Sequence, residues 1–118
     1  MVEDSAYLAD SLIDLLEMSG LDTLHAHSGT EGVSIALSQH PDLVLLDIRL
    51  PDISGYEVYR QIRDDDWGKT ARIIILTASE SVEVISQHVD LPLEYVLFKP
   101  EWSMQELQKK ILDRLTTP

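Results

Sequence analysis

The sequence contains no cysteine among its 118 residues. A disulfide framework and a thiolate metal site are therefore both excluded, and the absence is compatible with an intracellular location. Basic residues are also scarce, since Lys and Arg total 9 against 21 Asp and Glu, for a formal net charge of -12. Most of such a surface repels a phosphate backbone, so direct nucleic-acid binding is not expected.

Long apolar runs are missing as well. The longest strongly apolar segments, such as residues 73–76, are too short to span a bilayer, and the N-terminal MVEDS does not resemble a signal peptide. We therefore expect a cytoplasmic protein with no membrane contact. The chain has 44% apolar and 25% charged residues, which is ordinary for a globular protein, and its length predicts a single domain over residues 1–118.

Helical and extended patterns alternate along the chain. Apolar spacing predicts helices over about 7–19, 33–37, 56–63, 81–89 and 103–115, the last opening with a capping box at Ser103 and Glu106. Strands are expected at 21–27, 42–47, 71–78 and 94–98. Only Met1 and Val2 precede the first acidic pair, so we expect the chain to start inside a truncated first strand.

The apolar segment at 71–78 shows no polar alternation, which is typical of a strand covered on both faces. Strands that alternate with helices over short units predict right-handed crossovers. The predicted fold class is therefore α/β, a doubly wound five-stranded parallel sheet with helices on both faces.

Charged or hydroxyl side chains stand where the strands end, and ligands of an open parallel sheet bind at that edge. These residues are Glu3, Asp4, Asp47, Thr77 and Lys99. Three carboxylates meeting at one edge suit a hard cation such as Mg²⁺. The same ion would neutralise a phosphoryl group during its transfer, with a lysine and a threonine as further partners.

The motifs VEDS, LLDIRLPDISG, LTA and KP, in this order and spacing over nearly the whole chain, resemble the CheY-like receiver domains of two-component response regulators. The resemblance implies a flavodoxin-like fold with strand order 2-1-3-4-5. It implies a regulatory phosphoacceptor domain, not an enzyme. Asp47 would be the phosphoacceptor, Thr77 and Lys99 would contact the phosphoryl group, and Mg²⁺ would be held by Glu3, Asp4, Asp47 and the backbone carbonyl of Arg49.

The resemblance assigns further positions around this site. Pro100 would follow Lys99 through a cis peptide bond, and Gly55 would relax the backbone beside the acceptor loop. Arg49 and Ser79 would flank the water that removes the phosphoryl group. The expected partners are a histidine kinase or phosphotransfer protein, which donates the phosphoryl group, and an output domain or downstream protein.

The resemblance leaves the molecular context open. The chain could be a stand-alone regulator, the receiver of a transcription factor or the receiver of a hybrid histidine kinase. Family members commonly signal or form homodimers through the surface of the fourth helix, fifth strand and fifth helix. The cognate kinase and the signal are not encoded in any recognisable motif.

Two features depart from the family pattern. The position three residues before Lys99, usually an aromatic that switches rotamer, is Val96, and Tyr95 should point to the opposite face of the strand. The segment HVDLPLEY, which contains Pro92, replaces the usual small residues before the fifth strand. The site chemistry is expected to be retained, while the readout should differ from the common type.

Two other functions compete with this interpretation. A degenerate receiver would act only as a protein-interaction module, but all five site residues are present. A haloacid-dehalogenase-like phosphotransferase needs a second aspartate two residues after the nucleophile, where this chain has Arg49. His25 and His27 are expected on a solvated face without a metal, and Trp67 and Trp102 are expected to pack rather than bind ligands.

Overall fold

The computed structural model describes residues 1–2, 6–78 and 80–117. Five α-helices, three strands and three short 3-10 helices lie in this part of the chain. In chain order they are α1 (Ala6–Met18), α2 (Gly29–Gln39), β1 (Val44–Asp47), α3 (Gly55–Asp64), η1 (Gly68–Thr70), β2 (Ile73–Thr77), α4 (Val82–Ser86), η2 (Leu93–Tyr95), β3 (Val96–Phe98), η3 (Lys99–Glu101) and α5 (Met104–Thr116).

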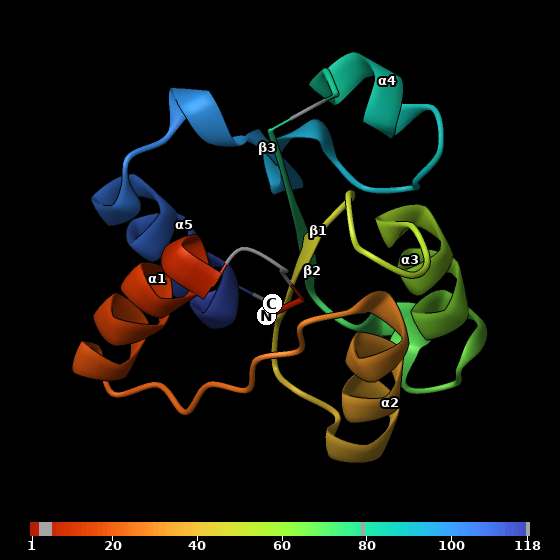
Figure 1. Ribbon diagram of the computed structural model, residues 1–118, viewed down its shortest axis with the longest axis horizontal. Helices are drawn as coiled ribbons and strands as arrows, with labels where there is room; N and C mark the ends of the chain where they lie inside the picture. Colours follow the sequence, from red (N-terminus) through yellow and green to blue (C-terminus); the bar gives the residue numbers. More distant parts are fainter. Residues whose placement is uncertain (3–5, 79, 118) are drawn as a thin grey trace.

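The sheet separates two layers of helices, as Figure 1 shows. On one face, strand residues such as Ile75 and Leu46 pack with apolar residues of α2, α3 and α4. On the other face, Ile74 and Leu97 pack with residues of α1 and α5. Neighbouring strand residues thus enter opposite layers, and the prediction of a sheet buried on both sides is confirmed.

All strand pairings in the described part of the chain are parallel. The three-stranded sheet has the order β1-β2-β3, and single parallel bridges join Val2 to Leu46 on one side and to Ala26 on the other. The chain segments therefore follow each other across the sheet in the order second, first, third, fourth and fifth. This confirms the predicted order 2-1-3-4-5.

The predicted strand at 21–27 is wrong in extent, because only Ala26 is paired. Leu21 packs with the apolar cluster of α1 and α5, and the chain first meets the N-terminal segment at the Leu24 carbonyl, which accepts from the Met1 amine at 2.6 Å. The intervening segment lines a cavity of about 580 Å³ together with Met1, Leu43 and Val44. This cavity lies at the amino ends of the strands, far from the edge where the candidate site was predicted.

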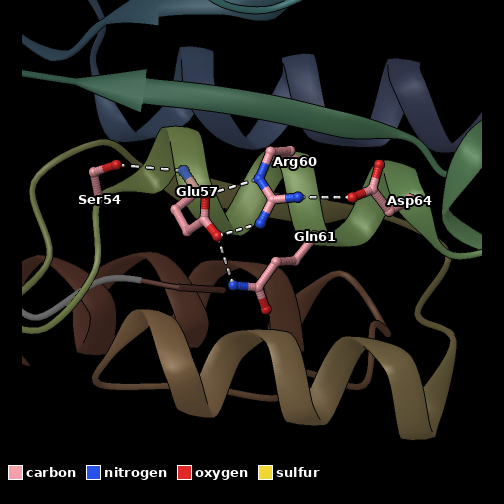
Figure 2. Close-up of polar contacts among 5 residues, drawn as sticks. All are labelled: Ser54, Glu57, Arg60, Gln61 and Asp64. Carbon is pink, nitrogen blue, oxygen red and sulfur yellow. Dashed lines mark hydrogen bonds and ion pairs between the residues drawn. The ribbon is translucent and has the colours of Figure 1, made fainter.

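Helix α3 directly follows the loop after β1, and a side-chain cap fixes its first turn. The Ser54 hydroxyl accepts a hydrogen bond from the Glu57 N–H at 3.3 Å, which caps the helix. Arg60 then donates to Glu57 at 2.9 Å and to Asp64 at 2.8 Å along the exposed face (Figure 2). These local bonds hold the first turns of α3 beside the candidate site.

Helix α4 is shorter than the predicted helix at 81–89 and ends at Ser86. Its one fully buried residue, Ile85, packs into the cluster shared with α2 and α3. Residues 87–92 then form turns and irregular chain as far as η2. None of the helices in the described ranges is both long and apolar enough to cross a membrane.

Candidate functional site

The strand register brings three of the predicted site residues to the same edge. Asp47 is the last residue of β1 and lies beside Leu76, one residue before the end of β2 at Thr77. Thr77 in turn lies beside Phe98, and Lys99 follows directly. Because the strands are parallel, these side chains leave the sheet at its carboxyl edge, as predicted.

Asp47 and Lys99 form an ion pair across this edge. The Lys99 Nζ donates to the Asp47 Oδ2 at 3.1 Å, and the two side chains are only 10% and 18% exposed for Asp47 and Lys99 respectively. The burial of a carboxylate at a strand end is costly unless a partner compensates its charge. Lys99 provides that partner, so the charge at the end of an apolar strand is explained.

The remaining contacts of Asp47 come from the loop that follows it. The Arg49 N–H donates to the Asp47 Oδ1 at 3.3 Å, which turns the chain immediately after β1. The Gly55 N–H donates to the Ile48 carbonyl at 2.7 Å and closes the loop. A Cβ on Gly55 would lie 2.2 Å from the Asp47 carbonyl oxygen, so this position requires glycine for close approach of two backbone segments.

Thr77 is fully buried at the end of β2. Its hydroxyl oxygen accepts a hydrogen bond from the Glu80 N–H at 3.3 Å, which ties the hydroxyl to the loop before α4. The side chain is therefore held by the segment that connects the sheet edge with α4.

Glu3, Asp4 and Ser79 were also predicted at this site, and they lie outside the described residues. The chain before Glu3 does reach the acceptor strand, because the Asp47 N–H donates to the Val2 carbonyl at 3.0 Å. Among the described residues alone, no three His, Asp or Glu side chains gather as a metal site. The described part of the site thus contributes one carboxylate, Asp47.

The cis peptide bond expected before Pro100 is not observed, so that sequence-based prediction is wrong. No cis bond occurs in the described ranges, so Lys99 and Pro100 are joined by a trans bond. The trans form is also the more stable one for an X-Pro bond. Here it is part of η3, whose turn is closed by the Trp102 N–H donating to the Lys99 carbonyl at 3.1 Å.

Val96 and Tyr95 face opposite layers, as predicted. Val96 is 3% exposed and packs in the cluster that includes Ile85 of α4. The Tyr95 ring lies in the α5 layer, where its centroid is 4.7 Å from the Arg114 guanidinium carbon and 5.3 Å from the Lys110 Nζ. Tyr95 is therefore not positioned as an aromatic between Thr77 and α4.

The two tryptophans pack as predicted. Trp67 stacks on His40 with ring centroids 4.8 Å apart, and Trp102 is partly buried in the α5 layer. The rings of His25 and His27 lie 4.2 Å apart, and neither belongs to a group of three metal-ligating side chains in the described ranges.

Sequence reasoning missed two polar contacts around the acceptor loop. The Asp52 carboxylate accepts from the Gly29 N–H at 2.8 Å and the Thr30 N–H at 2.9 Å, so it ties the loop to the start of α2. Hydrogen bonds from the Thr30 side chain and backbone hold the pKa of Asp52 well below its usual range. Asp52 follows Pro51 in the motif itself, but no local pattern indicates that α2 is its partner.

The second missed contact joins α3 to the loop after β2. The Tyr56 hydroxyl donates a hydrogen bond to the Glu80 carboxylate. Burial, and then the hydrogen bond with Glu80 and its charge, raise the pKa of Tyr56 to about 12. The two residues are 24 positions apart in the chain, and nothing in their sequence neighbourhoods pairs them.

Comparison with known proteins decides the family. The family model of the response regulator receiver domain matches residues 1–112. The chain belongs to the response regulator receiver domain family. The polar-differentiation response regulator DivK of Brucella ovis is 40% identical over 78 residues, which cover 66% of this chain and 63% of the relative. The matched part of this receiver domain thus spans less than two thirds of that relative.

Solved receiver domains have the same fold. The receiver domain of sensor histidine kinase PA1611 from Pseudomonas aeruginosa superposes with a TM-score of 0.84 and 25% identity, covering 98% of this chain and 94% of that one. That protein has a magnesium ion coordinated in its active site cleft. A CheY-like receiver domain protein from Methanospirillum hungatei has a TM-score of 0.79 and 25% identity, covering 97% and 89% of the two chains. The flavodoxin-like fold is confirmed.

Proposed function

We propose that this receiver domain accepts a phosphoryl group on Asp47 from a phosphorylated histidine of a partner kinase or phosphotransfer protein in the cytoplasm. The observation that carries the proposal is the ion pair between Asp47 and Lys99 at the carboxyl edge of the sheet, with Nζ and Oδ2 3.1 Å apart. The pair places a nucleophilic oxygen and a positive charge next to each other at this edge of the sheet. Phosphoryl transfer depends mainly on such positioning and charge stabilisation.

The transfer step assigns a role to each residue. An Asp47 carboxylate oxygen attacks phosphorus and forms the P–O bond while the P–N bond to the donor imidazole breaks. The electron pair of the broken bond stays on the imidazole nitrogen, and an acyl phosphate remains on Asp47. Lys99 stabilises the charge on the phosphoryl oxygens, and Thr77 donates a hydrogen bond to one of them.

Mg²⁺ fits the chemistry of the proposed donors, which are Glu3, Asp4, Asp47 and the backbone carbonyl of Arg49. When bound, the ion neutralises the phosphoryl oxygens and relieves the repulsion among the carboxylates. The proposal is supported by the magnesium ion in the cleft of the Pseudomonas receiver domain and by the Val2 carbonyl contact, which leads the chain to Asp47 one residue before Glu3. Arg49 and Ser79 are proposed to flank the water that later hydrolyses the acyl phosphate.

The context of the domain is also a proposal. Phosphorylation of Asp47 would shift the population between two conformations and so change the affinity for an output domain or downstream protein. The surface formed by α4, β3 and α5 is the proposed face for a homodimer or for this output contact. A place in a hybrid histidine kinase is consistent with the likeness to the PA1611 receiver.

The proposal is tested by incubation of the chain with acetyl phosphate and Mg²⁺, followed by mass spectrometry. We expect one added phosphoryl group on the unmodified chain, none on Asp47→Asn, and a rate about 10²-fold lower for Lys99→Ala. Removal of the divalent ion with EDTA should abolish labelling.

Asp42→Asn is the matched control, because Asp42 is an exposed aspartate two residues before the start of the same strand, β1. It should be labelled like the unmodified chain. Equal labelling of the Asp47→Asn variant, or no labelling of the unmodified chain, would contradict the proposal. Steady turnover of added phosphomonoesters would instead favour a phosphotransferase.

A further inference from the structure

Tyr56 connects the acceptor loop with the segment that carries α4. It is the second residue of α3, whose first residue, Gly55, is bonded to the Ile48 carbonyl at 2.7 Å. Its hydroxyl donates to the carboxylate of Glu80, which stands two residues before α4. The Tyr56 side chain thus bridges from the backbone next to Asp47 to the chain beyond β2.

Glu80 is bonded at both its main chain and its side chain. Its N–H donates to the Thr77 hydroxyl oxygen at 3.3 Å, while its carboxylate accepts from Tyr56. The distance of 3.3 Å is at the long end for such a bond, so a small displacement of the hydroxyl breaks it. Glu80 is therefore the one described residue that joins the Thr77 hydroxyl to α3 by hydrogen bonds on both sides.

The other end of this segment also contacts Tyr56. The ring of His88, two residues after the end of α4, lies 4.9 Å from the Tyr56 ring at an angle of 48°. The α4 segment is thus held against Tyr56 on both sides of the helix. The helix itself has only five residues, of which Ile85 is fully buried and Val82 is packed against the same core, so a small apolar contact holds the helix in place.

The family's usual aromatic is absent from the place where it could report on Thr77. Val96 has no polar group and is buried against α4, and Tyr95 lies in the α5 layer. A readout of the state of Asp47 must therefore use other side chains. Tyr56 and Glu80 are the described pair that contacts both the Thr77 hydroxyl and the α4 segment.

We propose that the Tyr56–Glu80 hydrogen bond is a latch that holds the segment 80–88 against α3 while Asp47 is unphosphorylated, and that phosphorylation opens it. The inference rests on the proposed function. When the Thr77 hydroxyl moves to a phosphoryl oxygen on Asp47, it leaves the Glu80 N–H, and the Glu80 carboxylate moves away from Tyr56. The segment 80–88 then becomes available to a partner.

Because of thermodynamic linkage, the strength of the latch can be measured as a change in the affinity of the acceptor site for a phosphoryl group. A bond that exists only in the unphosphorylated state lowers the affinity of that site for a phosphoryl group, and its removal raises the affinity by the same factor. A hydrogen bond to a charged group at a half-buried position corresponds to a change of about three- to thirty-fold. Burial, and then the hydrogen bond with Glu80 and its charge, raise the pKa of Tyr56 to about 12, so the phenol stays protonated as the donor of this bond.

The test measures the affinity of the Mg²⁺-loaded chain for beryllofluoride, a mimic of the phosphoryl group, by Trp fluorescence. We expect Tyr56→Phe to bind the mimic about three- to thirty-fold more tightly than the unmodified chain. Hydrogen exchange of the amides in the segment 80–88, measured without the mimic, should also become faster in this variant.

Tyr59→Phe is the matched control. Tyr59 lies on the same helix and its hydroxyl is contacted by Arg63 at 3.3 Å, but it is not part of the Tyr56–Glu80 bond. It should change neither the affinity for the mimic nor the hydrogen exchange of the segment 80–88. Glu80→Ala should reproduce the effect of Tyr56→Phe, and the double variant should gain no more than either single variant, because both remove the same bond.

The outcomes separate the two proposals. If the unmodified chain binds no beryllofluoride, the proposed function fails and the coupled latch fails with it. If the unmodified chain binds the mimic and Tyr56→Phe binds it equally or more weakly, the latch alone is overturned. Fully additive effects of Tyr56→Phe and Glu80→Ala would also overturn it.

Discussion

At the scale of single residues, Asp47 has its role because of what other strand ends bring to it. The apolar strand 44–46 delivers the carboxylate to the sheet edge, and Lys99 compensates its charge there. Both residues were predicted from the sequence, because any residue that ends a parallel strand must lie at the same edge. The partners of Asp52 and Tyr56 could not be predicted, since each depends on how a loop packs against a helix from another part of the chain.

Gly55 provides a prediction at this scale. The Gly55→Ala variant places a Cβ against the Asp47 carbonyl oxygen and the Ile48 Cα, at 2.2 and 2.6 Å, and neither backbone atom can move aside without opening the acceptor loop. We expect a loss of about 1–3 kcal/mol in the free energy of unfolding and much slower labelling of Asp47. Urea unfolding and acetyl phosphate labelling measure the two effects.

Gly20→Ala is the control for this variant. Gly20 has a φ of 87° with no atom within 4 Å of an added Cβ, so alanine costs about 1 kcal/mol of backbone strain, away from the site. It should lower stability without slowing the labelling of Asp47. A Gly55→Ala chain that is as stable and as well labelled as the unmodified one would contradict the close-approach argument.

At the scale of elements, the start of α5 was predicted from the sequence, whereas the ends of α2 and α4 were not. The capping box of Ser103 and Glu106 is present at the start of α5, because both its hydrogen bonds join residues within one turn. The prediction of a strand at 21–27 was wrong in extent. The alternation of apolar and polar residues is a local pattern, whereas a strand needs a neighbouring strand to pair with along its whole length. Only Ala26 has one, through Val2.

Glu57 on α3 provides a prediction of pH dependence. Hydrogen bonds from Arg60 and then Gln61 lower the pKa of Glu57 from 4.5 to about 2 (Figure 2). A lowered pKa in the folded state means that the ionised carboxylate contributes stability above pH 4.5, and that this contribution is lost as the pH falls toward 2. The difference in free energy of unfolding between the unmodified chain and Glu57→Gln should therefore shrink over this interval in urea titrations.

Glu31→Gln is the matched control for α3. Glu31 occupies the same position in α2 after its own N-cap, Ser28, but residues 34 and 35 are Ser and Ile, so no arginine follows one turn later. The Glu57→Gln comparison is set against this variant over the same pH interval. A Glu57→Gln difference that stays constant from pH 4.5 to 2 would show that Arg60 does not act on the pKa of Glu57.

At the scale of the whole molecule, the sheet lies between two separate apolar clusters, one on each of its faces. Ile74 and Ile75 are adjacent in β2, both fully buried, and each belongs to a different layer. We expect Ile74→Ala and Ile75→Ala each to lower the free energy of unfolding by about 2–5 kcal/mol. Urea denaturation measures both, with Leu93→Ala as a control at an apolar residue that is 59% exposed.

The control should change stability by no more than about 0.5 kcal/mol. A sheet covered by helices on one face only would make one of the two isoleucine variants nearly neutral. That result would contradict the two-layer arrangement in Figure 1.

The sequence by itself determined the alternation of helices and strands, the two-sided burial of the sheet and the residues that stand at the strand ends. These follow from periodicity and from the geometry of parallel strands, which are local rules. Only the tertiary structure decided that Tyr95 contacts Lys110 and Arg114, that Asp52 contacts the start of α2 and that Tyr56 contacts Glu80. Such contacts join side chains from elements far apart in the chain, and their partners depend on how the helices pack over the sheet.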